Sequence, residues 1–181
     1  MCSSDLKILF VQFRRAGWSP EDDQKQFEWV AKSYAQCGVK FEASPLVVAD
    51  APGGKVSIDP NQDEVDDGAI ARRIPVSHRP AVILLKRNIS FPSGYSYNTV
   101  HPPKEQALIG TAFVDSTVLN SIIKLSYYNV IAHELAHILV NAGHNQNDPP
   151  DILSAPIPHA DTINEEQCQQ IQSYPTVKAL N

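Results

Sequence analysis

The chain has 181 residues, of which 43% are hydrophobic, and its formal net charge is −5. This length suits a single domain over residues 1–181, and the hydrophobic content is sufficient for a buried core. Acidic and basic residues are dispersed, which argues against a nucleic-acid partner. We find no apolar run of about 18 residues and no signal peptide, so we expect no membrane span. The oligomeric state is open, with a monomer favoured.

The first fifty residues predict a strand, a helix and a second strand. The expected ranges are 1–5 for a frayed end, 6–13 for a buried strand, 19–38 for a helix and 39–49 for a second strand. Ser19 is a good N-cap and Gly38 a good terminator for the helix. Pro45 predicts a bulge or break within the second strand.

The middle of the chain predicts a long irregular segment followed by three strands. Residues 50–80 are rich in proline, glycine and aspartate, and the acidic stretch 63–68 is expected to be a solvated loop because its spacing does not fit a calcium-binding loop. Three strands are expected after it, over 81–87, 93–101 and 107–115. The alternation in 93–101 is typical of a short edge strand.

The last third of the chain predicts two helices joined by a loop. The first is expected to start between Ser116 and Ser126 and to run to about Val140. The second is expected over 162–174, with Thr162 as its cap and Glu165 completing a capping box. The order of elements predicts an α/β or α+β fold in one domain.

The first of these helices contains the sequence H-E-x-x-H. His133 and His137 are four residues apart, so they present two imidazoles on one face of the helix. Two such imidazoles can bind one metal ion. Glu134, beside the first histidine, can reach a water bound to that ion without being a ligand itself. This combination is typical of zinc peptidases, with two ligands and a general base. The apolar stripe lies about 200° away from His133 and is expected to be the core face, which leaves the histidines facing a cleft.

A catalytic zinc usually has a third protein ligand, and His144 is the leading candidate. On a continuous helix His144 would lie about 10 Å further along the axis from His137, so the helix must stop between them. Asn141 and Gly143 are the residues best able to adopt the left-handed conformation that ends helices. The sequence leaves acidic alternatives open, which are Asp148, Asp151, Glu165 and Glu166.

The residues His133, Glu134, His137 and His144 resemble the zinc motif of the metzincin metallopeptidases, H-E-x-x-H-x-x-G-x-x-H. The likeness to small bacterial members of this family is good over 130–170, and before that it extends only to the order of elements. It implies one metzincin-like domain with a twisted mixed β-sheet, an N-terminal helix, an active-site helix and a C-terminal helix. The implied parts are 116–144 for the active-site helix and zinc motif, 145–161 for a loop like the family's methionine turn, and 162–174 for the C-terminal helix.

Two departures from that motif affect the expected site. This chain has one extra residue before the third histidine, so Val140 stands where the family has its helix-ending glycine. Leu153 stands where the family has the methionine below the metal, and such an apolar replacement usually costs under about 1.5 kcal/mol. The family's tyrosine after that methionine is also missing. His159 is a candidate to support the site in its place.

The resemblance implies a zinc-dependent endopeptidase, with Zn²⁺ as cofactor and a protein or peptide as substrate. In that reading Glu134 activates a zinc-bound water, which hydrolyses the peptide bond. The substrate is expected to pair with the edge strand 93–101. The alternative is a catalytically weak or inactive metzincin-like zinc-binding module that binds a protein partner. In a third reading the motif is accidental and the domain holds no metal.

The three cysteines bear on location. Cys37 and Cys168 are expected to form a disulfide, because both lie at or near predicted helix ends. A disulfide indicates a secreted or periplasmic protein, whereas three free thiols would suit the cytosol. Cys2 could anchor a mature lipoprotein.

Overall fold

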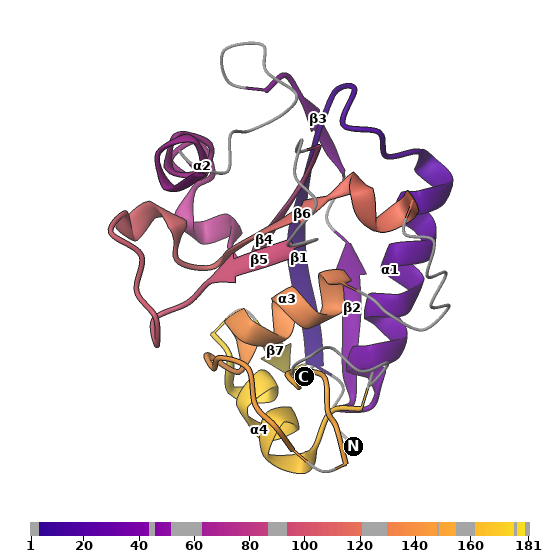
Figure 1. Ribbon diagram of the computed structural model, residues 1–181. Coiled ribbons are helices and arrows are strands. Elements are labelled where there is room, and N and C mark those ends of the chain that lie inside the picture. The colour runs from indigo at the N-terminus through magenta and orange to yellow at the C-terminus, as the bar shows by residue number, and fades with distance from the viewer. Residues whose placement is uncertain are drawn as a thin grey trace.

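The computed structural model shows a mixed α/β domain with a twisted open sheet (Figure 1). The structure describes residues 4–43, 46–51, 63–86, 94–120, 130–147, 149–154, 162–175 and 177–179. Several predictions therefore lie outside the described residues: the anchor at Cys2, the bulge or break at Pro45, the roles of Asp148 and His159, and the start of the active-site helix.

Seven described strands form the sheet, with the path β2-β1-β4-β6-β5. Their bounds are β1 Ser4–Phe13, β2 Val39–Ala43, β3 Val47–Ala49, β4 Ala81–Leu85, β5 Gly94–Tyr97, β6 Thr111–Asp115 and β7 Val177–Ala179. β1 pairs in parallel with β2, β3 and β4, and β6 pairs in parallel with β4. β5 is antiparallel to β6 and ends the path, as expected for an edge strand. All residues of β4 and β6 are buried, since both faces of the sheet are covered.

The first strand begins earlier than the sequence predicts, so the expectation that residues 1–5 are frayed is wrong for Ser4 and Asp5. Both residues belong to β1, and their neighbours on the two sides are β2 and β7. Ser4 pairs with Val39 in parallel and with Ala179 in the antiparallel direction. Pairing on both sides satisfies the backbone there, which fixes this end of the chain.

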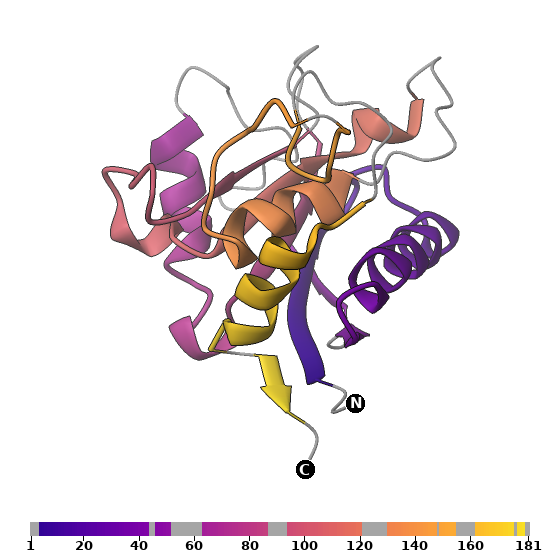
Figure 2. The same cartoon turned by 90° about the horizontal axis from the view of Figure 1, so that it is seen from below.

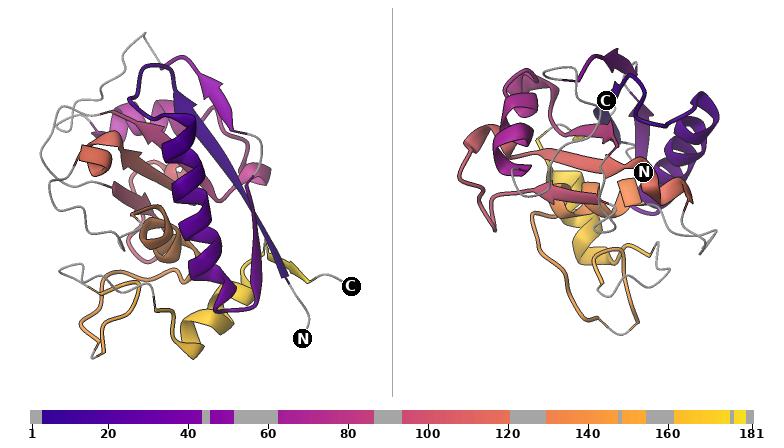
Figure 3. Two further views of the ribbon diagram at one scale, coloured as in Figure 1. Left: turned by 90° about the vertical axis from the view of Figure 1, so that its right-hand side faces the viewer. Right: turned by 45° about the horizontal axis from the view of Figure 1, so that its top comes forward.

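The described helices cover both faces of the sheet. Their bounds are α1 Pro20–Ala35, α2 Asp63–Ala71, α3 Val130–Leu139 and α4 Glu165–Ser173. Figure 3 shows α1 running along the sheet, and the hydroxyl of Tyr34 in α1 donates to the carbonyl of Ala132 in α3 at 2.9 Å, so the two helices lie together on one face. Figure 2 shows α4 beside α3. No helix among the described residues is long and apolar enough to cross a membrane.

Helix α1 begins as the sequence predicts. Ser19 caps it, accepting from the backbone N–H of Asp22, and Asp22 completes the capping box by bonding back to the backbone of Ser19. Gly38, at φ +67°, follows the last turn and leads directly into β2. Local sequence therefore determined both ends of this helix, because each end uses only neighbouring residues.

The acidic stretch 63–68 is not a loop, which corrects the sequence prediction. It forms the first two-thirds of α2. Asp67 is fully buried, and its carboxylate accepts hydrogen bonds from the hydroxyls of Tyr95 (2.6 Å) and Tyr97 (3.2 Å) on β5. These two donors lie about thirty residues away in sequence, so the pattern of charges alone did not reveal that one aspartate points inward.

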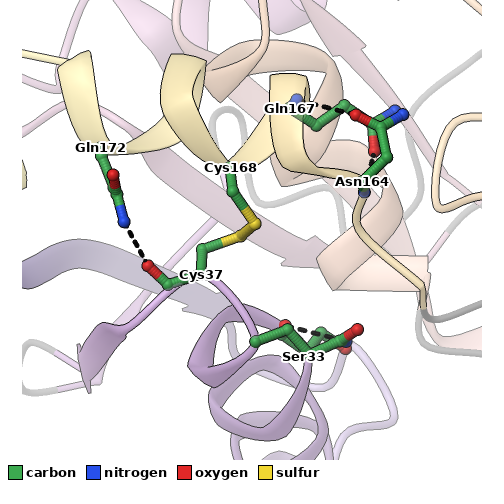
Figure 4. The surroundings of a disulfide bond; sticks show 7 residues. Ser33, Cys37, Asn164, Gln167, Cys168 and Gln172 are labelled. Atoms are coloured by element: carbon green, nitrogen blue, oxygen red, sulfur yellow. Dashed lines mark hydrogen bonds between the residues drawn. A yellow bond between two sulfur atoms is a disulfide. The ribbon is translucent and has the colours of Figure 1, made fainter.

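Helix α4 begins later than predicted, because Asn164 caps it instead of Thr162. The Asn164 side chain accepts from the backbone N–H of Gln167, and the Gln167 side chain bonds back to the backbone N–H of Asn164 (Figure 4). A disulfide joins Cys168 in this helix to Cys37 after α1, 131 residues earlier. The two helices that carry the bonded segments are therefore fixed to one another across the end of the sheet.

Candidate metal centre

Helix α3 carries the H-E-x-x-H residues in the middle of the molecule, packed against β5 and β6. Ile131, Leu135 and Ile138 lie in the core, as their spacing predicts. The helix is more buried than the sequence suggests, because all ten of its side chains are buried, including His133 and His137. A helix buried on all sides holds its polar residues in fixed positions, provided that they have partners.

Helix α3 ends at Leu139, two residues after the second histidine, as a third ligand requires. Asn141 adopts the left-handed conformation at φ +54°, whereas Gly143 does not have a positive φ. The N–H of Ala142 then donates to the carbonyl of His137 at 3.3 Å, which is the six-to-one bond of a Schellman motif. The chain turns back one residue later than in the metzincin pattern, and it brings His144 to the other two histidines. We call residues 140–147 and 149–154 the ligand loop.

The structure brings His133, His137 and His144 together. Nε2 of His133 lies 3.1 Å from Nε2 of His137 and 3.1 Å from Nε2 of His144. Among the described residues, this is the one group of three or more potential ligands whose atoms lie within 4.8 Å of each other. His144 is exposed, so solvent reaches the group from the side of the ligand loop.

The other ring nitrogens of the two helical histidines are held by backbone carbonyls. Nδ1 of His133 lies 2.5 Å from the carbonyl oxygen of Ile152, and Nδ1 of His137 lies 2.8 Å from that of Ala142. A carbonyl can only accept, so each Nδ1 carries the proton and each Nε2 presents a lone pair. Burial, then the neighbouring histidines, lower the pKa of His133 and of His137 to about 4, so both are neutral at pH 7.

This donor set fits a zinc ion. In a tetrahedral site with Zn–N bonds of about 2.0–2.1 Å, two ligand nitrogens are about 3.3 Å apart, close to the spacing seen here. With Nδ1 of each ring donating to a carbonyl, the Nε2 lone pairs of His133 and His137 are directed towards one another, where a bound cation would accept both. Carbonyl bonds to the second ring nitrogen are also typical of histidines that bind zinc.

Glu134 lies beside these histidines in a dry environment. Its side chain is only 6% exposed, and burial raises its pKa to about 8, opposed by a hydrogen bond from Ser96. The Ser96 hydroxyl, on β5, donates to Oε2 of Glu134 at 2.8 Å. At Gly94, on the same strand, a Cβ atom would lie 3.0 Å from Cγ of Glu134 and 2.6 Å from Val130. The edge strand therefore contacts the glutamate directly.

The acidic alternatives that the structure describes are Asp151, Glu165 and Glu166, and none of them belongs to the group of three histidines. Asp151 is buried and accepts hydrogen bonds within the ligand loop, and it is not in the group of three. Glu165 and Glu166 are exposed in the first turn of α4. Leu153, expected at the floor of the site, is buried, and the neighbouring Ile152 provides the carbonyl that holds His133. The rest of the predicted methionine-turn-like loop, 155–161, lies outside the described residues.

Sequence reasoning missed Asn98, which supports this centre, and His101, which lies beside it. Asn98, just after β5, donates from Nδ2 to the carbonyls of His137 and Ala142, both at 3.1 Å. The ring of His101 lies against Gly143, where a Cβ would be 3.2 Å from its Nε2. Neither has a local signal, because their partners are about forty residues away in sequence.

Comparison with known proteins gives a fold relationship. No protein-family model matches the chain, and no curated protein matches its sequence. The fold is similar to that of metalloproteinase-II from Bacteroides fragilis, known from a crystal structure, with a TM-score of 0.59 at 14% sequence identity. The likeness covers 96% of this chain and 53% of the other, so this chain spans about half the length of that protein. It shows a shared metalloproteinase-like fold, within which three histidines are placed to hold a metal ion.

Proposed function

We propose that this protein is a zinc-dependent endopeptidase of the metzincin-like type. The observation that carries the proposal is the convergence of His133, His137 and His144 next to the buried carboxyl of Glu134. A purely structural zinc site has no need of a glutamate in this position. The fold shared with a bacterial metalloproteinase is consistent with this function.

In this proposal the three imidazoles bind Zn²⁺ through Nε2. When bound, zinc supplies a Lewis acid that polarises the peptide carbonyl and makes water a stronger nucleophile near neutral pH. Glu134 accepts the proton of the attacking water and passes it to the leaving amine. Ser96 holds Oε2, which leaves Oε1 for the proton.

The proposed substrate is an extended peptide. β5 ends the path of the sheet, and the structure describes no strand on its outer side. A peptide can pair there main chain to main chain, as in other proteins that add a strand to a sheet edge. Ser96 and Gly94 lie on this strand and contact Glu134 and α3, so a peptide bound at the edge would lie close to the general base.

We also propose that the protein works outside the cytosol. The Cys37–Cys168 disulfide is compatible with an oxidising compartment such as the periplasm or the extracellular space. A net charge of −5 gives no electrostatic reason to expect nucleic acid as a partner.

The test combines metal content with proteolysis. Zinc per chain is measured in the purified wild type, in His144→Ala and in His78→Ala, and casein cleavage is measured in the wild type and in Glu134→Gln. His78 is an exposed histidine outside the group of three, which makes it a matched control. We expect stoichiometric zinc in the wild type and His78→Ala, weakened binding in His144→Ala, and cleavage lowered about 10²–10⁴-fold in Glu134→Gln.

The other outcomes separate the alternatives. A zinc content that His144→Ala leaves unchanged would indicate that an acidic side chain is the third ligand. Stoichiometric zinc without cleavage by the wild type would favour the zinc-binding module that binds a protein partner. No zinc in the wild type would overturn the proposal.

A further inference from the structure

The ligand loop is organised around one buried carboxylate, that of Asp151, which is 4% exposed. Its oxygens accept from the side-chain amides of Asn145 (3.0 and 3.1 Å), Asn147 (2.5 Å) and Gln167 (3.0 Å). The backbone N–H of Leu153 donates to Oδ1 at 2.9 Å. A buried carboxylate is costly unless such donors surround it, so this arrangement depends on all of them.

The charge on Asp151 is stabilised by these donors. Burial alone would raise its pKa, but the hydrogen bonds from Asn145, the Leu153 N–H, Asn147 and Gln167 together hold the pKa below its ordinary value. The carboxylate is therefore ionised at neutral pH and acts as an acceptor only. Hydrogen bonds to an ionised group are roughly twice as strong as those between neutral groups.

Two of these hydrogen bonds lead directly to the histidines. Asn145 follows His144 in the chain, and its backbone N–H donates to the carbonyl of Leu153 at 3.0 Å. Leu153 follows Ile152, whose carbonyl holds Nδ1 of His133 at 2.5 Å. The Asp151 carboxylate thus bonds to Asn145, the residue after His144. It also bonds to Leu153, the residue after Ile152, whose carbonyl orients His133.

Asp151 also ties the ligand loop to a rigid support. Gln167 and Asn164, which both donate to its Oδ2, form the capping box of α4. Figure 4 shows this box in the same first turns of α4 as Cys168, which is bonded to Cys37. The carboxylate therefore connects the loop to a helix that is bonded covalently to Cys37, between α1 and β2.

We propose that Asp151 is a positioning residue for the metal centre, which holds the Ile152 carbonyl against His133 and the chain after His144 in its place. The inference rests on the proposed metal centre and adds to it a residue that touches neither the metal nor the substrate. Residues that orient ligands in this way commonly change metal affinity 10- to 100-fold when mutated.

The test uses Asp151→Asn in the full chain, measured in two ways. In the metal-free protein, exchange of the His133 Nδ1 proton with solvent is followed by imidazole ¹⁵N NMR. In the loaded protein, the zinc dissociation constant is measured against a chelator, and the visible spectrum is recorded after cobalt substitution. Thr111→Val is the control, because it removes a fully buried hydroxyl that bonds to the Leu108 carbonyl, in β6 and outside the ligand loop.

We expect faster exchange and about tenfold weaker zinc binding in Asp151→Asn, with a changed cobalt spectrum, and no such changes in Thr111→Val. Asn145→Ala removes only the donor next to His144 and should give a smaller change in the same direction, which keeps the test open if Asp151→Asn fails to fold. Unchanged exchange, affinity and spectrum in a folded variant would overturn the inference. If the wild type binds no zinc, the proposed function fails, and the NMR measurement still decides whether Asp151 positions His133.

Discussion

Helix α3 and the ligand loop each supply part of the candidate metal centre, but they are held in different ways. In α3 every side chain is buried, and the helix is fixed by apolar packing on β5, β6 and α1. In the ligand loop the fixed points are hydrogen bonds, from Asn98 to the carbonyl of Ala142 and from several amides to Asp151. Apolar packing tolerates little movement, whereas a hydrogen-bonded loop can open locally. Changes in α3 should therefore cost global stability, and changes in the loop should act on the third histidine first.

The largest expected effect comes from the Cys37–Cys168 disulfide, which fixes α4. The ligand loop is held against this helix. The double variant Cys37→Ser/Cys168→Ser removes a crosslink spanning 131 residues, so we expect about 4 kcal/mol less free energy of unfolding, measured by urea denaturation. Zinc affinity should fall as well, because Gln167 is next to Cys168 and donates to Asp151. A loss of stability with unchanged zinc affinity would show that the loop does not depend on α4.

The second prediction tests the apolar packing that holds helix α3. Leu135 is fully buried in α3, and Leu135→Ala should lower the free energy of unfolding by about 3 kcal/mol through lost burial and a residual cavity. The zinc dissociation constant of the folded variant should stay within a factor of a few, because the loop contacts are untouched. Val76→Ala, at a 77% exposed position, is the control and should change stability by less than about 0.5 kcal/mol. A large loss of zinc affinity in folded Leu135→Ala would contradict the distinction.

The same distinction explains how far the sequence could predict this molecule. Strand β1, helix α1 and the H-E-x-x-H motif on α3 were predictable because their signals are local: an apolar run, a capping box, and two histidines four residues apart. Asn141 was identified as one of two residues able to end α3, and the structure gives it the left-handed conformation. In each case, neighbouring residues determine the conformation.

The polar parts were not predictable in this way. Asp67 and Asp151 both look like loop residues in the sequence, yet both are buried and take donors from distant elements. Ser96 gives no sign that its hydroxyl reaches Glu134, 38 residues later. Hydrogen bonds between elements follow the tertiary arrangement and have no period along the chain, so a pattern search does not detect them.

The third prediction compares Gly94, which lies against α3, with Gly143 in the ligand loop. At Gly94 a Cβ would come within 2.6 Å of Val130 and 3.0 Å of Glu134, both on the tightly packed α3. Gly94→Ala should therefore cost about 2 kcal/mol of unfolding free energy and lower the proposed peptidase activity, as β5 or Glu134 shifts. At Gly143 the Cβ would meet only the end of the His101 ring, at 3.2 Å. Gly143→Ala should cost less than about 0.5 kcal/mol, since that side chain can turn away. Equal costs would mean that the loop is packed as rigidly as the helix.

The smallest expected effect concerns Asp23 in α1, a buried aspartate whose surroundings are the opposite of those of Asp151. It is 3% exposed, and among the described residues neither of its carboxylate oxygens has a hydrogen-bond partner. Burial, and then repulsion from Asp22, raise its pKa from 3.8 to about 6. The folded protein therefore holds a proton that the unfolded chain has released between these values, and the wild type loses stability as the pH rises from about 4 to about 6.

Asp23→Asn does not titrate, so it should avoid this loss. We expect it to be more stable than the wild type by about 1 kcal/mol at pH 7, a value that allows for screening by nearby solvent. The difference should shrink as the pH falls below 6 and be small near pH 4, where the side chain is protonated in the folded wild type and close to half protonated in the unfolded chain. Urea denaturation of both proteins at pH 4, 5, 6 and 7 measures it. A variant that is less stable than the wild type at pH 7 would mean that Asp23, like Asp151, is held by donors, and that the apolar side of the molecule also depends on buried hydrogen bonds.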